Sequence, residues 1–71
     1  MNYEDLTVRQ AKLTLDNNNW QSFLFTMFND MTNETIYGID SPFFNGYRIP
    51  NRTAKALIKQ GYKIKEYHWT L

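Results

Sequence analysis

A chain of 71 residues and 8.5 kDa can enclose one hydrophobic core and is too short for two, so residues 1–71 are interpreted as a single small globular domain. Apolar residues make up 42% and aromatic residues 17% against 21% charged, which excludes a disordered tail. The absence of cysteine and the single histidine exclude disulfides, thiolate chemistry and cysteine-based zinc sites. No metal and no cofactor is therefore expected.

The chain carries no membrane or export signal that the sequence reveals. No apolar run approaches the roughly 20 residues of a membrane span, and the acidic start at Glu4 and Asp5 differs from the basic start of a signal peptide. A soluble cytoplasmic protein is expected. Eight asparagines and an excess of lysine over arginine are typical of AT-rich genomes, such as those of low-GC bacteria and their phages, so a phage or mobile element is one compatible source.

The first predicted element is a helix over residues 5–16. It has an acidic start and the strong helix formers Gln10 to Leu13 in its middle, before the asparagines at 17–19 stop it. Residues 12–16 also alternate between polar and apolar as a strand does. The helix is favoured.

Two interpretations compete for residues 20–39. A helical stripe at i, i+3, i+4, i+7, i+8 and i+11 would contain Trp20, Phe23, Leu24, Met27, Phe28 and Met31. Alternatively, the aromatic-rich segment 23–28 and the strand-like segment 35–40 form a hairpin. The hairpin is preferred, because the second segment is plainly strand-like and sequential strands usually pair.

The remaining segments predict a turn, a helix and a last strand. Asn45 and Gly46 favour a tight turn between Phe43–Phe44 and Tyr47–Arg48, which would pair as a small hairpin. A helix follows over residues 52–60, capped by Asn51 or Thr53 and closed by Gly61. Residues 62–71 alternate as a strand. The expected fold class is α+β: a small antiparallel sheet of about three strands, one N-terminal helix, and one short helix before the last strand.

The charge is distributed unevenly. Residues 1–40 carry two basic and six acidic side chains, a net charge of −4, whereas residues 41–71 carry six basic and one acidic, a net charge of +5. The basic side chains could contact nucleic acid phosphates, which is the alternative function. This candidate nucleic-acid set is Arg52, Lys55, Lys59, Lys63 and Lys65. A solvated helix face explains the lysines more simply.

An enzyme is not expected. His68 lies near the chain end, and no motif ties a nucleophile or an orienting carboxylate to it, although Glu66 would share its strand face. No glycine-rich phosphate loop, nucleophile elbow or calcium loop is present.

The sequence instead favours a protein-binding module, because the supply of aromatic side chains is generous for so small a core. The function expected is that of a small regulator or inhibitor that occludes a surface of a larger protein. Self-association as a homodimer and a role as an accessory subunit are equally compatible with the sequence. The candidate partner-binding residues are Phe43, Phe44, Tyr47, Arg48, Tyr67 and Trp69.

Overall fold

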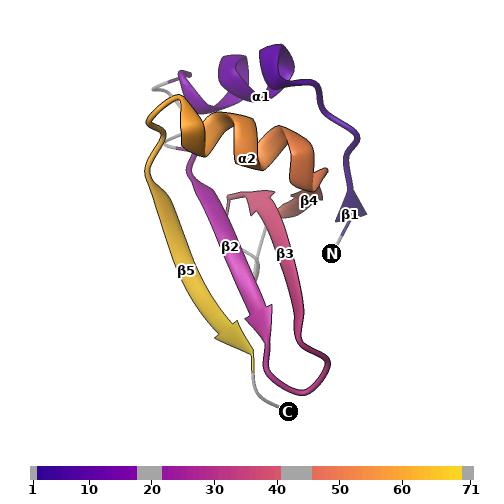
Figure 1. Ribbon diagram of the computed structural model, residues 1–71. Helices are drawn as coiled ribbons and strands as arrows, with labels where there is room; N and C mark the ends of the chain where they lie inside the picture. Colours follow the sequence, from indigo (N-terminus) through magenta and orange to yellow (C-terminus); the bar gives the residue numbers. More distant parts are fainter. Residues whose placement is uncertain (1, 18–21, 41–45, 70–71) are drawn as a thin grey trace.

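The computed structural model describes residues 2–17, 22–40 and 46–69, with Trp69 described by its backbone only. This part of the chain forms an α+β fold with two helices and a five-stranded mixed sheet (Figure 1). In chain order the elements are β1 (Asn2–Tyr3), α1 (Val8–Leu15), β2 (Leu24–Asn29), β3 (Glu34–Ile39), β4 (Tyr47–Ile49), α2 (Asn51–Lys59) and β5 (Ile64–Trp69).

The sheet order is β1-β4-β3-β2-β5. β2, β3 and β4 are antiparallel neighbours, whereas β1 pairs with β4 and β5 with β2 in parallel. Strands β1 and β2 are therefore joined through α1, and β4 and β5 through α2, as two crossovers in the same direction across the sheet. Because such crossovers are right-handed, both helices lie on one face of the sheet, called here the helix face (Figure 1).

The core lies between the two helices and one end of the sheet. Leu24, Ile39 and Ile49 from the strands are fully or almost fully buried, and they form one cluster with Ala11 of α1 and with Ala54 and Leu57 of α2. The buried residues of α2 fall three and four positions apart, which is the spacing of one helical face.

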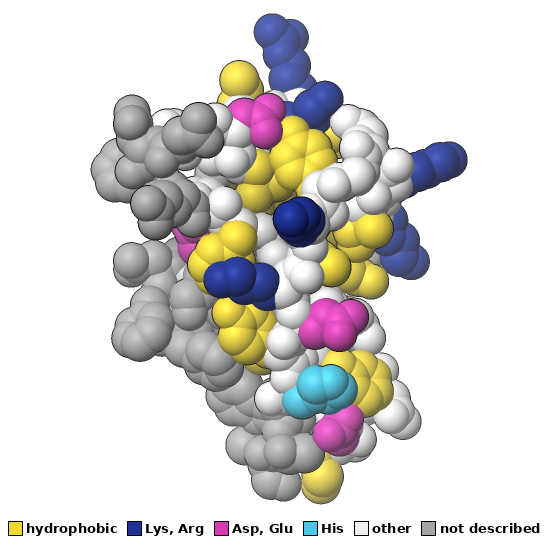
Figure 2. Space-filling view, turned by 90° about the vertical axis from the view of Figure 1, so that its left-hand side faces the viewer, with side chains coloured by type: hydrophobic (Ala, Val, Ile, Leu, Met, Phe, Trp, Pro, Cys, Tyr) yellow, Lys and Arg dark blue, Asp and Glu magenta, His cyan; other side chains and the backbone are white. Residues whose placement is uncertain are grey.

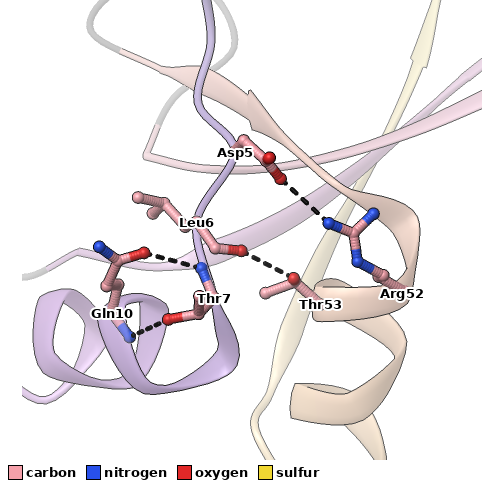
Figure 3. Close-up of polar contacts among 6 residues, drawn as sticks. All are labelled: Asp5, Leu6, Thr7, Gln10, Arg52 and Thr53. Carbon is pink, nitrogen blue, oxygen red and sulfur yellow. Dashed lines mark hydrogen bonds and ion pairs between the residues drawn. The ribbon is translucent and has the colours of Figure 1, made fainter.

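The segment before α1 ties the start of both helices together (Figure 3). Thr7 and Gln10 form a capping box, in which each side-chain oxygen accepts a hydrogen bond from the other residue's backbone amide. The hydroxyl of the buried Thr53 donates to the Leu6 carbonyl at 2.8 Å, and Arg52 pairs with Asp5 at 3.1 Å. Helix α1 therefore begins at its threonine cap, later than the acidic start that the sequence suggested.

Helix α2 ends as predicted and begins differently. Gly61 has a φ of +99°, its amide donates to Ile58, and the Tyr62 amide donates to Leu57. These two hydrogen bonds make a Schellman motif. The predicted cap is wrong, because Pro50 precedes the helix without a side-chain cap hydrogen bond and Asn51 is its first residue.

The hairpin prediction for residues 23–28 and 35–40 is confirmed as β2 and β3, which rules out a helix over residues 24–29. The expectation of a wholly antiparallel sheet is wrong, because the last strand pairs with β2 in parallel. Tyr47 and Arg48 belong to β4, whose neighbours are β3 and β1. Phe43, Phe44 and Asn45, the other half of the small hairpin, lie outside the described residues.

Candidate functional site

The sheet extends beyond the helices at its hairpin end, as Figure 1 shows. Burial decreases along β2 from Leu24 and Phe25 towards the turn, and it increases again along β3 until Gly38 and Ile39. We call the projecting part the distal sheet: residues 27–36 of the β2–β3 hairpin, together with the end of β5. Its apolar side chains are Met27, Phe28, Met31, Ile36 and Tyr67.

Most apolar side chains of the distal sheet are only half-buried, and Met31 in the turn is 68% exposed. On the helix face, the ring of Phe28 meets His68 edge to face at 6.3 Å, and Nδ1 of His68 lies 4.0 Å from Oδ1 of Asp30. On the opposite face, Tyr67 lies level with Met27 and Ile36 across three strands. Apolar surface is thus available on both faces of the sheet.

Phe25 anchors the distal sheet to the rest of the molecule. Its side chain is fully buried although it projects from the face opposite the helices. The ring lies over Gly38 of the neighbouring strand and meets Tyr67 edge to face at 6.2 Å. The absence of a side chain at Gly38 provides the space for this ring.

The predicted partner-binding residues are divided between the two faces. Tyr47 packs against the core on the helix face, whereas Arg48 projects from the opposite face, where its guanidinium lies 3.3 Å from Glu34. Tyr67 belongs to the distal sheet. Phe43 and Phe44 lie outside the described residues, and of Trp69 only the strand position is described.

Tyr47 also has the electrostatics of a packed side chain. Burial raises the pKa of its phenol above 10.0, the carboxylates of Asp40 and Glu4 add to this rise, and a hydrogen bond with Thr14 opposes it. The contacts of Tyr47 therefore assign it to the packing beneath α1.

The predicted nucleic-acid set is also spread over the surface. Lys55 and Lys59 are exposed on α2, on the helix side of the sheet. Lys65 projects from the opposite face, and its ammonium lies 4.1 Å from the centre of the Phe23 ring. Arg52 is in contact with Asp5, and Lys63 is exposed before β5.

Charged side chains are distributed unevenly over the molecule (Figure 2), although acids such as Asp5 and Asp16 also lie at the helix end. In this view onto the β5 side, Lys and Arg side chains lie over the upper and middle parts of the molecule, whereas the lower part carries Asp, Glu and His side chains. Asp30, Glu34 and Glu66 belong to the hairpin and to β5, so the distal sheet has an acidic border.

Within residues 2–17, 22–40 and 46–69, no three His, Cys, Asp or Glu side chains are grouped as a metal site would require. Neither α1 nor α2, the helices of that part, has the length and apolar character needed to cross a membrane.

Sequence reasoning missed the distal sheet as a site, although the lengths of the elements contain a signal for it. A helix of nine residues spans about 14 Å, and a strand of six residues spans about 20 Å. Helices as short as α1 and α2 therefore leave part of such strands uncovered.

Comparisons of the chain with protein-family models, with curated proteins and with solved structures found no match.

Proposed function

We propose that the protein is a non-enzymatic protein-binding module, a small regulator or inhibitor that occludes a surface of a larger protein. The observation that supports this most directly is the burial gradient along β2 and β3, which leaves aromatic and methionine side chains half-exposed at one end of the sheet. These residue types concentrate in the central part of protein interfaces, because they offer a large contact area.

The charges around the distal sheet specify the chemistry of the target. Asp30 and Glu66 border the apolar side chains, and Glu34 is already compensated by its ion pair with Arg48. The lysines of α2 lie at the helix end of the molecule. A complementary target has an apolar patch bordered by Lys or Arg side chains, because matched charges steer the approach of the two proteins and fix their orientation. Binding is then stoichiometric, and inhibition is steric.

The same distribution disfavours nucleic acid as the partner. The half-buried rings of the distal sheet, which could stack on bases, lie beside carboxylates that repel phosphates. The lysines of α2 and the ammonium of Lys65 are on different sides of the sheet, so a single backbone track does not cover them.

A pair of matched variants tests the proposed surface. Met31 in the hairpin turn and Leu13 on α1 are both 68% exposed, so replacing either by serine should leave the fold intact. The wild-type protein, Met31→Ser and Leu13→Ser would be immobilised and used to capture proteins from the native cell, with identification by mass spectrometry and measurement of affinity for each captured protein.

We expect Met31→Ser to weaken binding of the captured target by about tenfold and Leu13→Ser to leave it unchanged. Equal binding by both variants would place the contact elsewhere. Capture of nucleic acid with an affinity that falls steeply with salt, and that is lost in Lys55→Glu/Lys59→Glu, would instead favour the alternative function.

A further inference from the structure

The outer edge of β5 pairs with no other strand in the described part of the chain. Of the five strands in the described part of the chain, β5 is an edge strand and pairs only with β2, in a continuous six-residue register from Ile64 to Trp69. The other edge is formed by β1, which has only two residues. An edge of this length is suited to pairing with another strand.

Lysines usually protect such an edge, but here they protect it poorly. The side chain of Lys65 is directed along the sheet, with its ammonium over the Phe23 ring. Lys63 lies before the strand begins. The rest of the edge consists of an acidic side chain, an aromatic ring and an imidazole, at Glu66, Tyr67 and His68.

We propose that this edge binds a second copy of the chain, with the two β5 strands antiparallel about a two-fold axis at Tyr67. In a two-fold pair of antiparallel strands, directly opposite side chains share a face, so the axis must pass through a residue that faces its own copy. Four residues inside β5 could occupy this position: Lys65, Glu66, Tyr67 and His68.

Charge and length select one of these four registers. An axis at Lys65 or at Glu66 places two like charges directly opposite, which is destabilising. An axis at His68 leaves only residues 67–69 of each strand paired. An axis at Tyr67 pairs residues 65–69, and it places Glu66 of each copy opposite His68 of the other.

The Glu66–His68 pair fits the surroundings of both side chains. Both project from the helix face at the edge of the sheet, and the His68 side chain is 70% exposed. His68 already faces the Asp30 carboxylate from the β2–β3 turn and the ring of Phe28. The second copy adds one carboxylate, which accepts a hydrogen bond from a neutral imidazole and forms an ion pair with a protonated one.

The resulting dimer has one continuous sheet with twice the five strands of a single copy. A two-fold axis perpendicular to the sheet keeps the helices of both copies on one face. The two Tyr67 rings meet at the axis on the opposite face. The two lysines at position 65 are four residues apart along the pair, about 14 Å, so their repulsion is small. This inference does not depend on the proposed function.

Disulfide crosslinking of single-cysteine variants can determine the register of the dimer, because the natural chain has no cysteine. In the proposed dimer, the two copies of residue 67 have Cα atoms about 4.5–5.5 Å apart, within reach of a disulfide. Tyr67→Cys should therefore oxidise to a covalent dimer, whereas Glu66→Cys and Lys65→Cys should not. Efficient crosslinking of Glu66→Cys or Lys65→Cys in place of Tyr67→Cys would overturn the register.

A charge exchange tests the same register while Tyr67 stays in place. His68→Glu places a carboxylate directly opposite Glu66 in each of the two symmetric pairs. The dissociation constant of the dimer should therefore rise at least tenfold. Glu66→Lys/His68→Glu restores opposite charges and should recover the dimer. Light scattering distinguishes the monomer of 8.5 kDa from a particle of twice that mass. A wild-type protein that remains monomeric at about 1 mM, or a double variant no more dimeric than His68→Glu, would overturn the proposal.

Discussion

At the scale of single residues, Gly38 and Phe25 act as one unit. A Cβ built on Gly38 would overlap the Tyr47 carbonyl oxygen and the Phe25 ring. The backbone oxygen belongs to the paired strand β4 and cannot move aside without disturbing the sheet. Gly38→Ala should therefore cost roughly 3 kcal/mol, the upper end for overpacking, as measured by urea unfolding.

Gly61→Ala is the matched control, because a Cβ there meets no atom and only the positive φ of +99° opposes the change. Gly61→Ala should lower the free energy of unfolding by roughly 1 kcal/mol, because only the backbone conformation is unfavourable. Equal costs at the two glycines would show that the ring does not depend on the space above Gly38.

Tyr62 connects the segment after α2 to the end of α1. Its hydroxyl donates to Oδ1 of Asp16 at 2.8 Å, and this hydrogen bond, with burial and the carboxylate charge, raises the pKa of the phenol above 10.0. The folded state therefore holds the phenolic proton more tightly than the unfolded chain does. The stabilisation is complete below about pH 10 and is lost as the pH rises through the raised pKa.

Urea unfolding of the wild type and Tyr62→Phe from about pH 8 to about pH 11 checks this linkage. The wild type should be the more stable protein at the lower end, and the difference should shrink above pH 10. A difference that stays constant with pH would show that the hydrogen bond to Asp16 does not persist in solution. Asp16→Asn, which keeps an acceptor and removes the charge, should flatten the dependence.

At the scale of the elements, the capping box determines where α1 begins. Thr7→Ala removes the side-chain acceptor for the Gln10 amide and should cost about 1 kcal/mol of unfolding free energy. Thr32→Ala, at an exposed position in the β2–β3 turn, is the control and should change stability by less than about 0.5 kcal/mol. If both variants unfold at the same urea concentration, the capping hydrogen bond makes no contribution to the stability of the protein.

The elements that the sequence predicted well have local chemical signals. Gly61 ended α2 because only a residue tolerant of positive φ suits that position. The paired apolar segments around the 30–33 turn predicted the hairpin. Thr7 and Gln10 have the spacing of a capping box, which is the local signal for the start of α1.

Strand pairing was predicted less well, because it depends on contacts far apart in the chain. Alternation in residues 64–69 identifies a strand without showing its neighbour or its direction. The order helix, hairpin, strand, helix, strand nevertheless contains a clue: a strand that follows a crossover helix usually returns in parallel. The two-residue β1 has no periodicity to detect. The candidate site was predicted poorly for the same reason. Tyr47 and Arg48 are adjacent in sequence, but their side chains lie on opposite faces of the sheet.

At the scale of the whole molecule, the core lies at the helix end of the sheet, whereas the hairpin end is less buried. Amides of β2 and β3 near Leu24 and Ile39 should exchange with deuterium slowly, because their hydrogen bonds open only when the core opens. Amides of residues 30–33 should exchange fast. Uniform protection along the hairpin, measured by NMR, would contradict this gradient.

The same measurement distinguishes a lone subunit from a dimer. In a strand at the edge of a sheet, alternate amides face away from the neighbouring strand and exchange readily with solvent. In the proposed dimer, these β5 amides donate to the second copy, so their protection should rise with protein concentration in step with the dimer fraction. The amides of the 30–33 turn lie outside the new pairing and should exchange at the same rate at every concentration. Concentration-dependent protection at the turn and none in β5 would move self-association from the strand edge to the hairpin end.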